Sequence, residues 1–182
     1  IHRWDRETSG IILVASKREY VASFQALFTN HKIQKIYYGV VRGFSQEYLI
    51  IDSLVKGRDA LVYKTAETHV KLIDKVVLDI PVKPYDSSRY SLIELKPITG
   101  RMHQLRIHMN KVSTPLINDT KYGDKNHNLM YENLFGCTNL FLHAGSLEFT
   151  HPFTNQILVL KSSFSTDWIQ LFQRFSWENP LK

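Results

Sequence analysis

The stretch HRWDRETSGIILVA, residues 2–15, joins a highly charged segment to a continuous apolar run. The residues at 10–15 have the composition of a short strand that is buried on both faces. Directly before this predicted strand, Asp5 stands between Arg3 and Arg6. A carboxylate in that position can form an ordinary ion pair, take part in a nucleic-acid contact or act as a nucleophile. The stretch itself leaves these three interpretations open.

The composition of the whole chain narrows the class of protein. Its 182 residues suit one domain with enough chain to bury a core. A formal net charge of +6 and an isoelectric point near 9.4 favour an anionic partner, of which nucleic acid is the commonest. Cys137 is the only cysteine, which excludes an intramolecular disulfide and a cysteine-based zinc site. It also indicates a reducing, cytoplasmic location.

The sequence shows neither a membrane segment nor a targeting segment. The longest apolar runs, such as 11–15 and 157–160, are far too short to span a bilayer. No signal peptide is recognisable. Because the chain opens on Ile1 within a patterned stretch, we expect further sequence upstream of it.

The hydrophobic pattern predicts few helices and several strands. Apolar residues recur at helical spacing over 17–32, where the helix is expected to end before Asn30, and over 101–112. A short helix is predicted over 166–175, with Ser165 or Thr166 as its cap. Runs rich in β-branched or aromatic residues predict strands at 10–15, 36–42, 91–95, 140–142, 147–150 and 157–161.

The order of these elements predicts the fold class. Residues 150–156 form a predicted hairpin connection, and residues 119–139, rich in Asn, Lys and Gly, form a predicted long surface loop. The strands do not alternate regularly with helices. The predicted class is therefore α+β, with a mixed, mostly antiparallel sheet and a few flanking helices.

The helix predicted over 101–112 carries an informative cation. At about 100° per residue, Arg106 lies roughly 80° from the centre of the apolar stripe, with His103 and Asn110 beside it. A guanidinium at such a half-buried boundary pairs with a carboxylate or phosphate, or packs its stem on the core with its head in water. His103 and His108 lie on different faces of this helix, so a metal site is not expected there.

Two adjacent tyrosines lie in the strand predicted over 36–42. Tyr37 and Tyr38 point to opposite faces of that strand, so only one of them can line a cleft while the other packs. One of these tyrosines, Asp5 and Arg106 would form a coherent trio if the fold brings them together.

Five motifs resemble those of the RluA-type pseudouridine synthases, in the same order along the chain. HRWDRETSG at 2–10 resembles the family signature HRLDxxTSG, and KIYYGVVRG at 35–43 is similar to the strand K-x-Y-x-A-x-V-x-G, which aligns Tyr37 with the family's tyrosine. The other three are PITGRMHQLRIHM at 97–109, which resembles TGRTHQIRVH, STPLINDTKYG at 113–123, which is similar to HPxxGDxxYG, and LHAGSLEFTHPFT at 142–154, which resembles LHAxxLxFxHP. Together the motifs are spread from residue 2 to residue 154.

The resemblance implies an enzyme that isomerises uridine to pseudouridine in structured RNA, either ribosomal or transfer RNA. It implies a pseudouridine synthase catalytic domain over residues 1–182, without the N-terminal strands and the S4-type module that often precede this domain in the family. It implies no metal and no cofactor, and we expect a monomer whose partner is RNA. The alternative is a catalytically inactive, basic RNA-binding domain with the same fold.

The resemblance also implies roles for individual residues. Asp5 maps to the catalytic aspartate, and Arg106 maps to the basic residue that pairs with this carboxylate and favours its charged form. Tyr37 maps to the tyrosine that stacks on the target base and is the candidate to move the C5 proton. A uridine inside a stem must be flipped out, and Arg3 is expected to fill the vacated place or to hold the extruded nucleotide.

Further contacts with RNA are expected from the charged and polar residues of the same motifs. These are His2, Arg6, Lys35, Arg101, His103 and Gln104. Trp4 and Met102 depart from the family pattern, and both are expected to face the core or the wall of the cleft.

Overall fold

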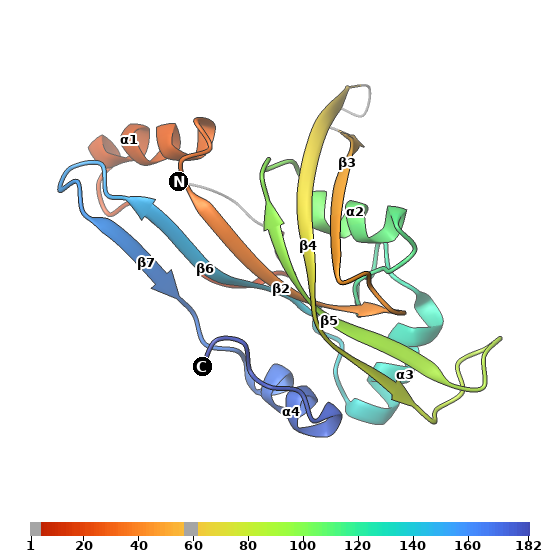
Figure 1. Ribbon diagram of the computed structural model, residues 1–182. Helices are drawn as coiled ribbons and strands as arrows, with labels where there is room; N and C mark the ends of the chain where they lie inside the picture. The colour runs from red at the N-terminus through yellow and green to blue at the C-terminus, as the bar shows by residue number, and fades with distance from the viewer. Residues whose placement is uncertain (1–4, 57–61) are drawn as a thin grey trace.

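A computed structural model of the chain describes residues 5–56 and 62–182 (Figure 1). Its helices are α1 (Arg18–Thr29), α2 (Gln104–Lys111), α3 (Lys125–Phe135) and α4 (Thr166–Phe175). Its strands are β1 (Ser9–Gly10), β2 (Gln34–Arg42), β3 (Tyr48–Lys56), β4 (Tyr63–Leu78), β5 (Ser88–Pro97), β6 (Leu142–Thr150) and β7 (Ile157–Lys161). Among the described residues, no helix has the length and hydropathy that crossing a membrane would require.

The strands form one twisted sheet (Figure 1). The strand order is β1-β6-β2-β5-β4-β3, and β7 pairs with the part of β6 that β1 leaves open. The pair β1–β6 is parallel, whereas the other pairs in the described sheet are antiparallel. The predicted α+β class with a mixed, mostly antiparallel sheet is therefore confirmed.

Alternate residues of the central strands enter two separate cores. On one face, Val40 and Leu92 pack with apolar side chains of α3 and α4. On the other face, Val41 and Ile93 pack with Leu105 and other apolar residues of α2 and its surroundings. Because successive side chains of a strand point to opposite faces, α2 lies across the sheet from α3 and α4. Full burial of each such side chain stabilises the fold by about 1.5–3 kcal/mol.

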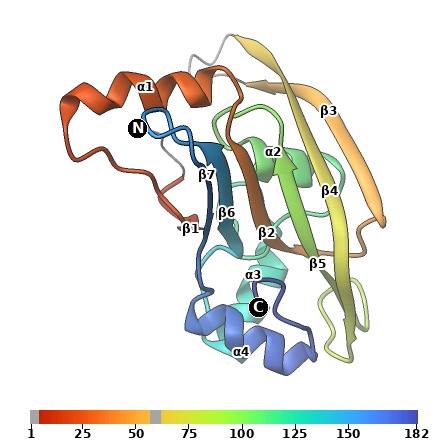
Figure 2. The ribbon, with the colours of Figure 1, turned by 60° about the vertical axis from the view of Figure 1, so that its left-hand side comes forward.

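Helix α1 covers a third apolar cluster. Phe24 and Leu27 pack there with Leu147 and Phe149 of β6. Figures 1 and 2 both show α1 at one end of the sheet, near β6 and β7, with α3 and α4 at the other end. The stretch between these ends, where β2 and β5 run side by side, carries the candidate site.

The three predicted helices are present. The helix predicted over 166–175 has these bounds, with Ser165 at the N-cap position. The helix predicted from Lys17 to a point before Asn30 is α1, and its predicted end is confirmed. The helix predicted over 101–112 is shorter, as α2. The backbone of α2 begins only at Gln104 because His103 has a left-handed conformation, with φ of +54°, that a right-handed helix cannot include.

The strand predicted over 10–15 is wrong beyond its first residue. Gly10 has φ of +106°, and a Cβ at this position would collide with the backbone carbonyl of Ala144. Gly10 therefore ends β1, and the following chain leaves the sheet. As a result, Ile12 and Val14 are 50% and 77% exposed rather than buried.

The other predicted strands are present, some as parts of longer ones. Those at 36–42 and 91–95 lie within β2 and β5, and the one at 157–161 is β7. The prediction at 147–150 lies within β6, whereas the one at 140–142 overlaps this strand only at Leu142. The hairpin predicted at 150–156 joins the antiparallel pair β6–β7 and is confirmed.

The predicted loop at 119–139 is wrong, because this segment contains α3. Asp124 caps the helix, since its carboxylate accepts the backbone N–H groups of Asn126 and His127 at 2.9 and 3.3 Å. The segment also begins with a buried residue, Asp119. The strands β3 and β4, which pair with each other along their length, were not predicted either.

Candidate active site

A short turn places Asp5 next to the first turn of α2. The backbone N–H of Thr8 donates to the carbonyl oxygen of Asp5 at 3.0 Å and closes this turn. Ser9 and Gly10 then pair with β6, which fixes the segment to the sheet. The loop after β5 leads into α2 beside the same segment. The side chain of Asp5 therefore contacts a helix that begins about a hundred residues later in the chain.

Gln104 holds the loop between β5 and α2. Its Oε1 accepts from the Thr99 hydroxyl at 2.7 Å and from the Arg101 backbone N–H at 3.0 Å. Its Nε2 donates to the Glu67 carbonyl and the Thr68 hydroxyl, both at 2.9 Å. These four bonds use the full capacity of a buried amide. We therefore assign Gln104 to the support of this loop rather than to the RNA contact expected from the sequence.

Arg106 is the centre of a cluster of carboxylates. Its Nε and Nη2 donate to the two oxygens of Asp119 at 2.8 and 2.6 Å. Its Nη1 donates to Asp5 Oδ2 at 3.3 Å, and its Nη2 lies 2.8 Å from Glu7 Oε2. The predicted pairing of Asp5 with Arg106 is confirmed. The guanidinium is only 4% exposed, however, so it is buried and not at the half-buried boundary that the helix pattern predicted.

The charges in this cluster are fixed by their mutual contacts. Burial alone would lower the pKa of Arg106, but the hydrogen bond and charge of Asp119, with the charges of Glu7 and Asp5, outweigh it and raise this pKa. Burial alone would raise the pKa of Asp119, but the bonds from Arg106 and from two backbone N–H groups lower it. Arg106 is therefore a permanent cation next to Asp5.

His103 holds the second oxygen of Asp5. Its Nε2 lies 3.1 Å from Asp5 Oδ1, and its Nδ1 lies 3.0 Å from the hydroxyl of Tyr122. When Nε2 donates to the carboxylate, Nδ1 of the neutral ring accepts from the tyrosine. The ring of Tyr122 also packs 5.5 Å from the guanidinium carbon of Arg106. Both oxygens of Asp5 are thus oriented by the start of α2.

Tyr37 lines the same site from β2. Tyr38 points to the opposite face, where it is 6% exposed and packs against Phe164. This confirms that only one of the two tyrosines lines a cleft. Burial, and secondarily the negative charge of Asp5, raises the pKa of Tyr37 to about 12. Its phenol is consequently neutral across the physiological pH range.

These residues lie along a cleft of about 810 Å³. Besides Asp5, Tyr37 and Arg106, its walls include Lys35, Arg101, His103 and Met102. Met102 is 45% exposed and forms part of the wall, as expected. A cleft of this size lies within the range of ligand-binding sites. In the described part of the chain, no group of three or more His, Cys, Asp or Glu side chains could hold a metal ion.

Comparisons with known proteins agree with this geometry. The profile of the family described as RNA pseudouridylate synthase matches residues 1–111. The tRNA pseudouridine synthase C of Vibrio parahaemolyticus serotype O3:K6 (strain RIMD 2210633) is 39% identical, over all of this chain and 78% of that protein. The chain belongs to the RNA pseudouridylate synthase family. It is accordingly an RNA pseudouridine synthase, an isomerase.

Further relatives of this pseudouridine synthase support the same assignment. The tRNA pseudouridine synthase C of Haemophilus influenzae (strain ATCC 51907 / DSM 11121 / KW20 / Rd) is 38% identical, over 98% of this chain and 79% of that protein. The solved structure of human RNA pseudouridylate synthase domain containing 4 has a TM-score of 0.75 at 23% identity, over 98% of this chain and 76% of that one. Human RNA pseudouridylate synthase domain containing 1 has a TM-score of 0.70 at 20% identity, over 98% and 80%. These two structures share its fold.

The residues expected to contact RNA differ in their position and exposure at the cleft. Lys35 lies in the cleft wall, and burial lowers the pKa of its amine. Arg101 lies in the same wall, with its Nε donating to the Thr65 carbonyl at 3.2 Å. Arg6 is exposed at the cleft, and His103 contacts Asp5. The expectations for His2, Arg3 and Trp4 lie outside the described residues.

Three residues of this site were not found from the sequence. Asp119 and Glu7 bind Arg106, and Tyr122 binds His103. Asp119 and Tyr122 both lie in STPLINDTKYG, at positions where the similar family segment HPxxGDxxYG carries Asp and Tyr. Their residue types within that motif were the signal that could have identified them. Glu7 lies within the first motif, at one of its variable positions, and gave no such signal.

Proposed function

We propose that this synthase converts uridine to pseudouridine in transfer RNA, with Asp5 as the catalytic carboxylate. The observation that carries the proposal is the fixation of both Asp5 oxygens, by Arg106 and His103, in a cleft that Tyr37 also lines. The choice of tRNA over ribosomal RNA is supported by the names of relatives at 35–39% identity, which are tRNA pseudouridine synthases C.

The reaction is an isomerisation that this arrangement can support without further groups. The bond between C1′ and N1 breaks, a bond between C1′ and C5 forms, the C5 hydrogen leaves as a proton and N1 gains one. A carboxylate that attacks either the sugar or the base must be charged. The permanent cation of Arg106 supplies a fixed counter-charge for Asp5, and His103 restricts its rotation.

Tyr37 fits a role that follows the attack by Asp5. As a neutral phenol it offers a ring face for stacking on uracil. Abstraction of the C5 proton is unfavourable while burial and the charge of Asp5 both raise its pKa. Once Asp5 is neutralised in a covalent adduct, one of these two causes is removed. Tyr37 is therefore better suited to the C5 proton after Asp5 has reacted than before.

Basic residues around the cleft supply the attraction for the RNA backbone. Lys35, Arg101 and Arg6 lie along or beside its walls. Each cation that neutralises a phosphate releases counterions. The logarithm of the RNA-binding constant should therefore fall linearly with the logarithm of the salt concentration. Arg106 contacts the carboxylates of Asp5, Glu7 and Asp119 and offsets one of their three negative charges.

Release of tritium from [5-³H]uridine-labelled RNA tests the function directly. We expect release from tRNA, none from ribosomal RNA, and none from tRNA with Asp5→Asn, which preserves the size of the side chain. Release from ribosomal RNA alone would overturn the tRNA assignment. Full activity of Asp5→Asn would overturn the role of Asp5. Binding of tRNA without any release would favour the inactive RNA-binding domain named as the alternative.

A further inference from the structure

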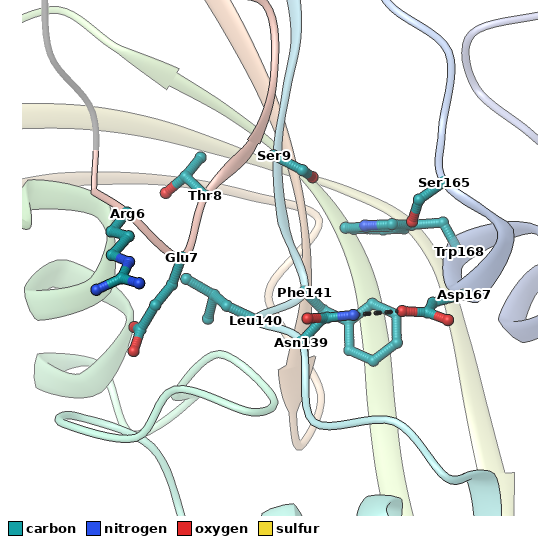
Figure 3. Close-up of a pocket in the computed structure, with 10 residues that line it drawn as sticks. All are labelled: Arg6, Glu7, Thr8, Ser9, Asn139, Leu140, Phe141, Ser165, Asp167 and Trp168. Carbon is teal, nitrogen blue, oxygen red and sulfur yellow. Dashed lines mark hydrogen bonds between the residues drawn. The ribbon is translucent and has the colours of Figure 1, made fainter.

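A second cavity lies beside the active-site cleft. It has a volume of about 290 Å³ and is lined by segments 6–9 and 139–141 together with Ser165, Asp167 and Trp168 (Figure 3). Arg6 and Thr8 line both the cavity and the cleft, so a single strip of chain separates the two. Neither the catalytic chemistry nor the family motifs account for this cavity.

The buried wall of the cavity presents an unused hydrogen-bond donor. Trp168 is 2% exposed, and its ring packs against Phe141 and Phe164 with centroid separations of 5.2 and 4.9 Å. Within the described ranges, its Nε1–H has no hydrogen-bond partner. Figure 3 shows the indole extending from α4 toward the Ser9 side of the cavity. The Trp168 side chain lines the cavity, and its Nε1–H is not among the fully buried polar atoms that lack a partner. The donor is therefore available to a ligand acceptor in the cavity.

The cavity also presents acceptors. The amide nitrogen of Asn139 donates to Asp167 Oδ2 at 2.7 Å, which orients both side chains (Figure 3). This bond leaves the side-chain Oδ1 of Asn139 for a donor, and the Asp167 carboxylate, which the Cys137 thiol also contacts, can accept a further hydrogen bond. Ser165 stands at the N-cap of α4, but its side chain makes no capping bond there.

The charges of the cavity disfavour a phosphate. Two carboxylates, Glu7 and Asp167, line it against one guanidinium, Arg6. A neutral ring whose edge offers both a donor and an acceptor satisfies Asp167 and Trp168 at the same time. Adenine, cytosine and guanine have such an edge and also carry an amino group, whose two N–H donors can serve both Asp167 and the side-chain Oδ1 of Asn139. Uracil offers only its single N3–H donor between two carbonyl acceptors.

We propose that this cavity receives an unstacked nucleobase that carries an amino group, from a nucleotide close to the target uridine in the RNA. This inference rests on the proposed function, since it assumes that an RNA strand occupies the neighbouring cleft. The amino group donates to Asp167, and a ring nitrogen or carbonyl oxygen accepts from Trp168. From Asp5 to Thr8 the chain spans at most about 11 Å, so one RNA strand can reach both places.

Nuclear magnetic resonance of the indole N–H of Trp168 tests the proposal without any catalysis. The native protein is titrated with AMP, CMP, GMP and UMP, and the signal is assigned by its loss in Trp168→Phe. We expect saturable shifts with one or more of the amino-bearing nucleotides and binding of UMP that is weaker by roughly tenfold or more, because the single N3–H of uracil leaves one of the two acceptors without a partner.

Two substitutions make the test specific. Asp167→Asn should remove most of the discrimination against UMP while the Trp168 signal remains. If Trp168→Phe fails to fold, this variant still tests the proposal. Asp86→Asn, at an exposed position of the connection between β4 and β5, should leave the discrimination unchanged. An absence of shifts with all four nucleotides, or equal affinity for UMP, would overturn the proposal.

The result is independent of the proposed substrate. If the Trp168 signal shows the expected discrimination but tRNA releases no tritium, the cavity binds nucleobases and the tRNA assignment fails. If tRNA releases tritium and the signal does not respond, the assignment stands and the cavity proposal fails.

Discussion

Asp119 holds Arg106 through two parallel hydrogen bonds of 2.8 and 2.6 Å, both shorter than the 3.3 Å bond from Arg106 to Asp5. The side chain of Asp119 is fully buried. The carboxylate that fixes the guanidinium is therefore not the one proposed for catalysis. Asp5 is left at the partly open end of the cluster, where it can reach a substrate.

Asp119→Asn should impair catalysis through Arg106. The variant loses one hydrogen bond to the buried guanidinium and one of its three carboxylate partners, so the free energy of unfolding should fall by about 2 kcal/mol. The misplaced guanidinium should lower kcat for tritium release from tRNA by roughly tenfold to a hundredfold, with little change in KM. Steady-state kinetics below the melting transition measure both parameters.

Asp124→Asn is the matched control for this prediction. Asp124 also pairs with an arginine, Arg42, at 2.6 Å, but it caps α3 outside the cleft. Its replacement should cost about 1 kcal/mol of stability and leave kcat unchanged. Equal losses of kcat in the two variants, at matched folded fractions, would show that Asp119 has no specific role.

His103 should act as a positioning residue for Asp5. Loss of its Nε2 contact in His103→Ala frees one carboxylate oxygen and should lower kcat roughly tenfold. Tyr122→Phe, which removes only the partner of Nδ1, should have a smaller effect. His103→Gln should recover part of the lost rate, because its amide can still donate to Asp5. Single-turnover tritium release compares these variants.

A similar histidine elsewhere provides the control for His103. His69 contacts Glu67 at 2.6 Å and Tyr48 at 2.9 Å, outside the cleft. His69→Ala should leave the single-turnover rate unchanged. If His103→Gln were as slow as His103→Ala, the bond to Asp5 would not be the cause of the effect.

Tyr37→Phe should separate stacking from proton transfer. The phenylalanine ring keeps the stacking surface but cannot take up the C5 proton. We expect tRNA affinity to stay within about twofold and kcat to fall by roughly a hundredfold or more. Tyr38→Phe, on the opposite face of β2, should leave kcat unchanged. A Tyr37→Phe variant with nearly native kcat would assign the proton transfer to another group.

The arrangement of the candidate site was predictable wherever a short-range period or a motif determined it. The alternation along β2 separated Tyr37 from Tyr38, and the motif around Arg106 identified its pairing with Asp5, whereas the helical pattern alone placed Arg106 at a half-buried boundary although it is buried. Asp119 was not predictable from its surroundings, which are rich in Asn, Lys and Gly and resemble a loop. Its burial depends on the bonds from Arg106, a tertiary contact that no local pattern records.

The missed strands have a similar explanation. The sequence of β4, YKTAETHVKLIDKVVL, carries several charged residues and no regular apolar alternation. Its extended conformation depends on pairing with both β3 and β5, with a bulge between Leu72 and Asp74. In contrast, the strand predicted over 10–15 had a favourable local composition, but Gly10 directs the chain away from β6.

Two buried histidines should make the stability of the synthase depend on pH. Burial lowers the pKa of His143 to about 4, and burial with the charge of Lys111 lowers that of His108 to about 4. The unfolded chain, with histidine pKa values near 6.5, binds these protons more readily. The stabilising contribution of these two neutral histidines is therefore complete above pH 6.5 and is lost as the pH decreases toward 4. At pH 4.5 the loss of unfolding free energy is about 2 kcal/mol for each histidine. The pKa of Asp119 is lowered from 3.8, so its protonation reduces stability only at pH values below those at which the histidines titrate.

Urea denaturation at pH 7.0 and pH 4.5 measures this dependence. In His143→Gln the decrease in unfolding free energy between the two pH values should be smaller by about 2 kcal/mol, because one of the two titrating groups is removed. Ser162→Ala is the control, since it removes the hydroxyl 2.6 Å from His143 Nε2 but keeps the imidazole buried. Ser162→Ala should lower the unfolding free energy at both pH values but preserve most of its decrease between pH 7.0 and pH 4.5. An equal decrease in His143→Gln and the native protein would exclude His143 as a source of the acid sensitivity.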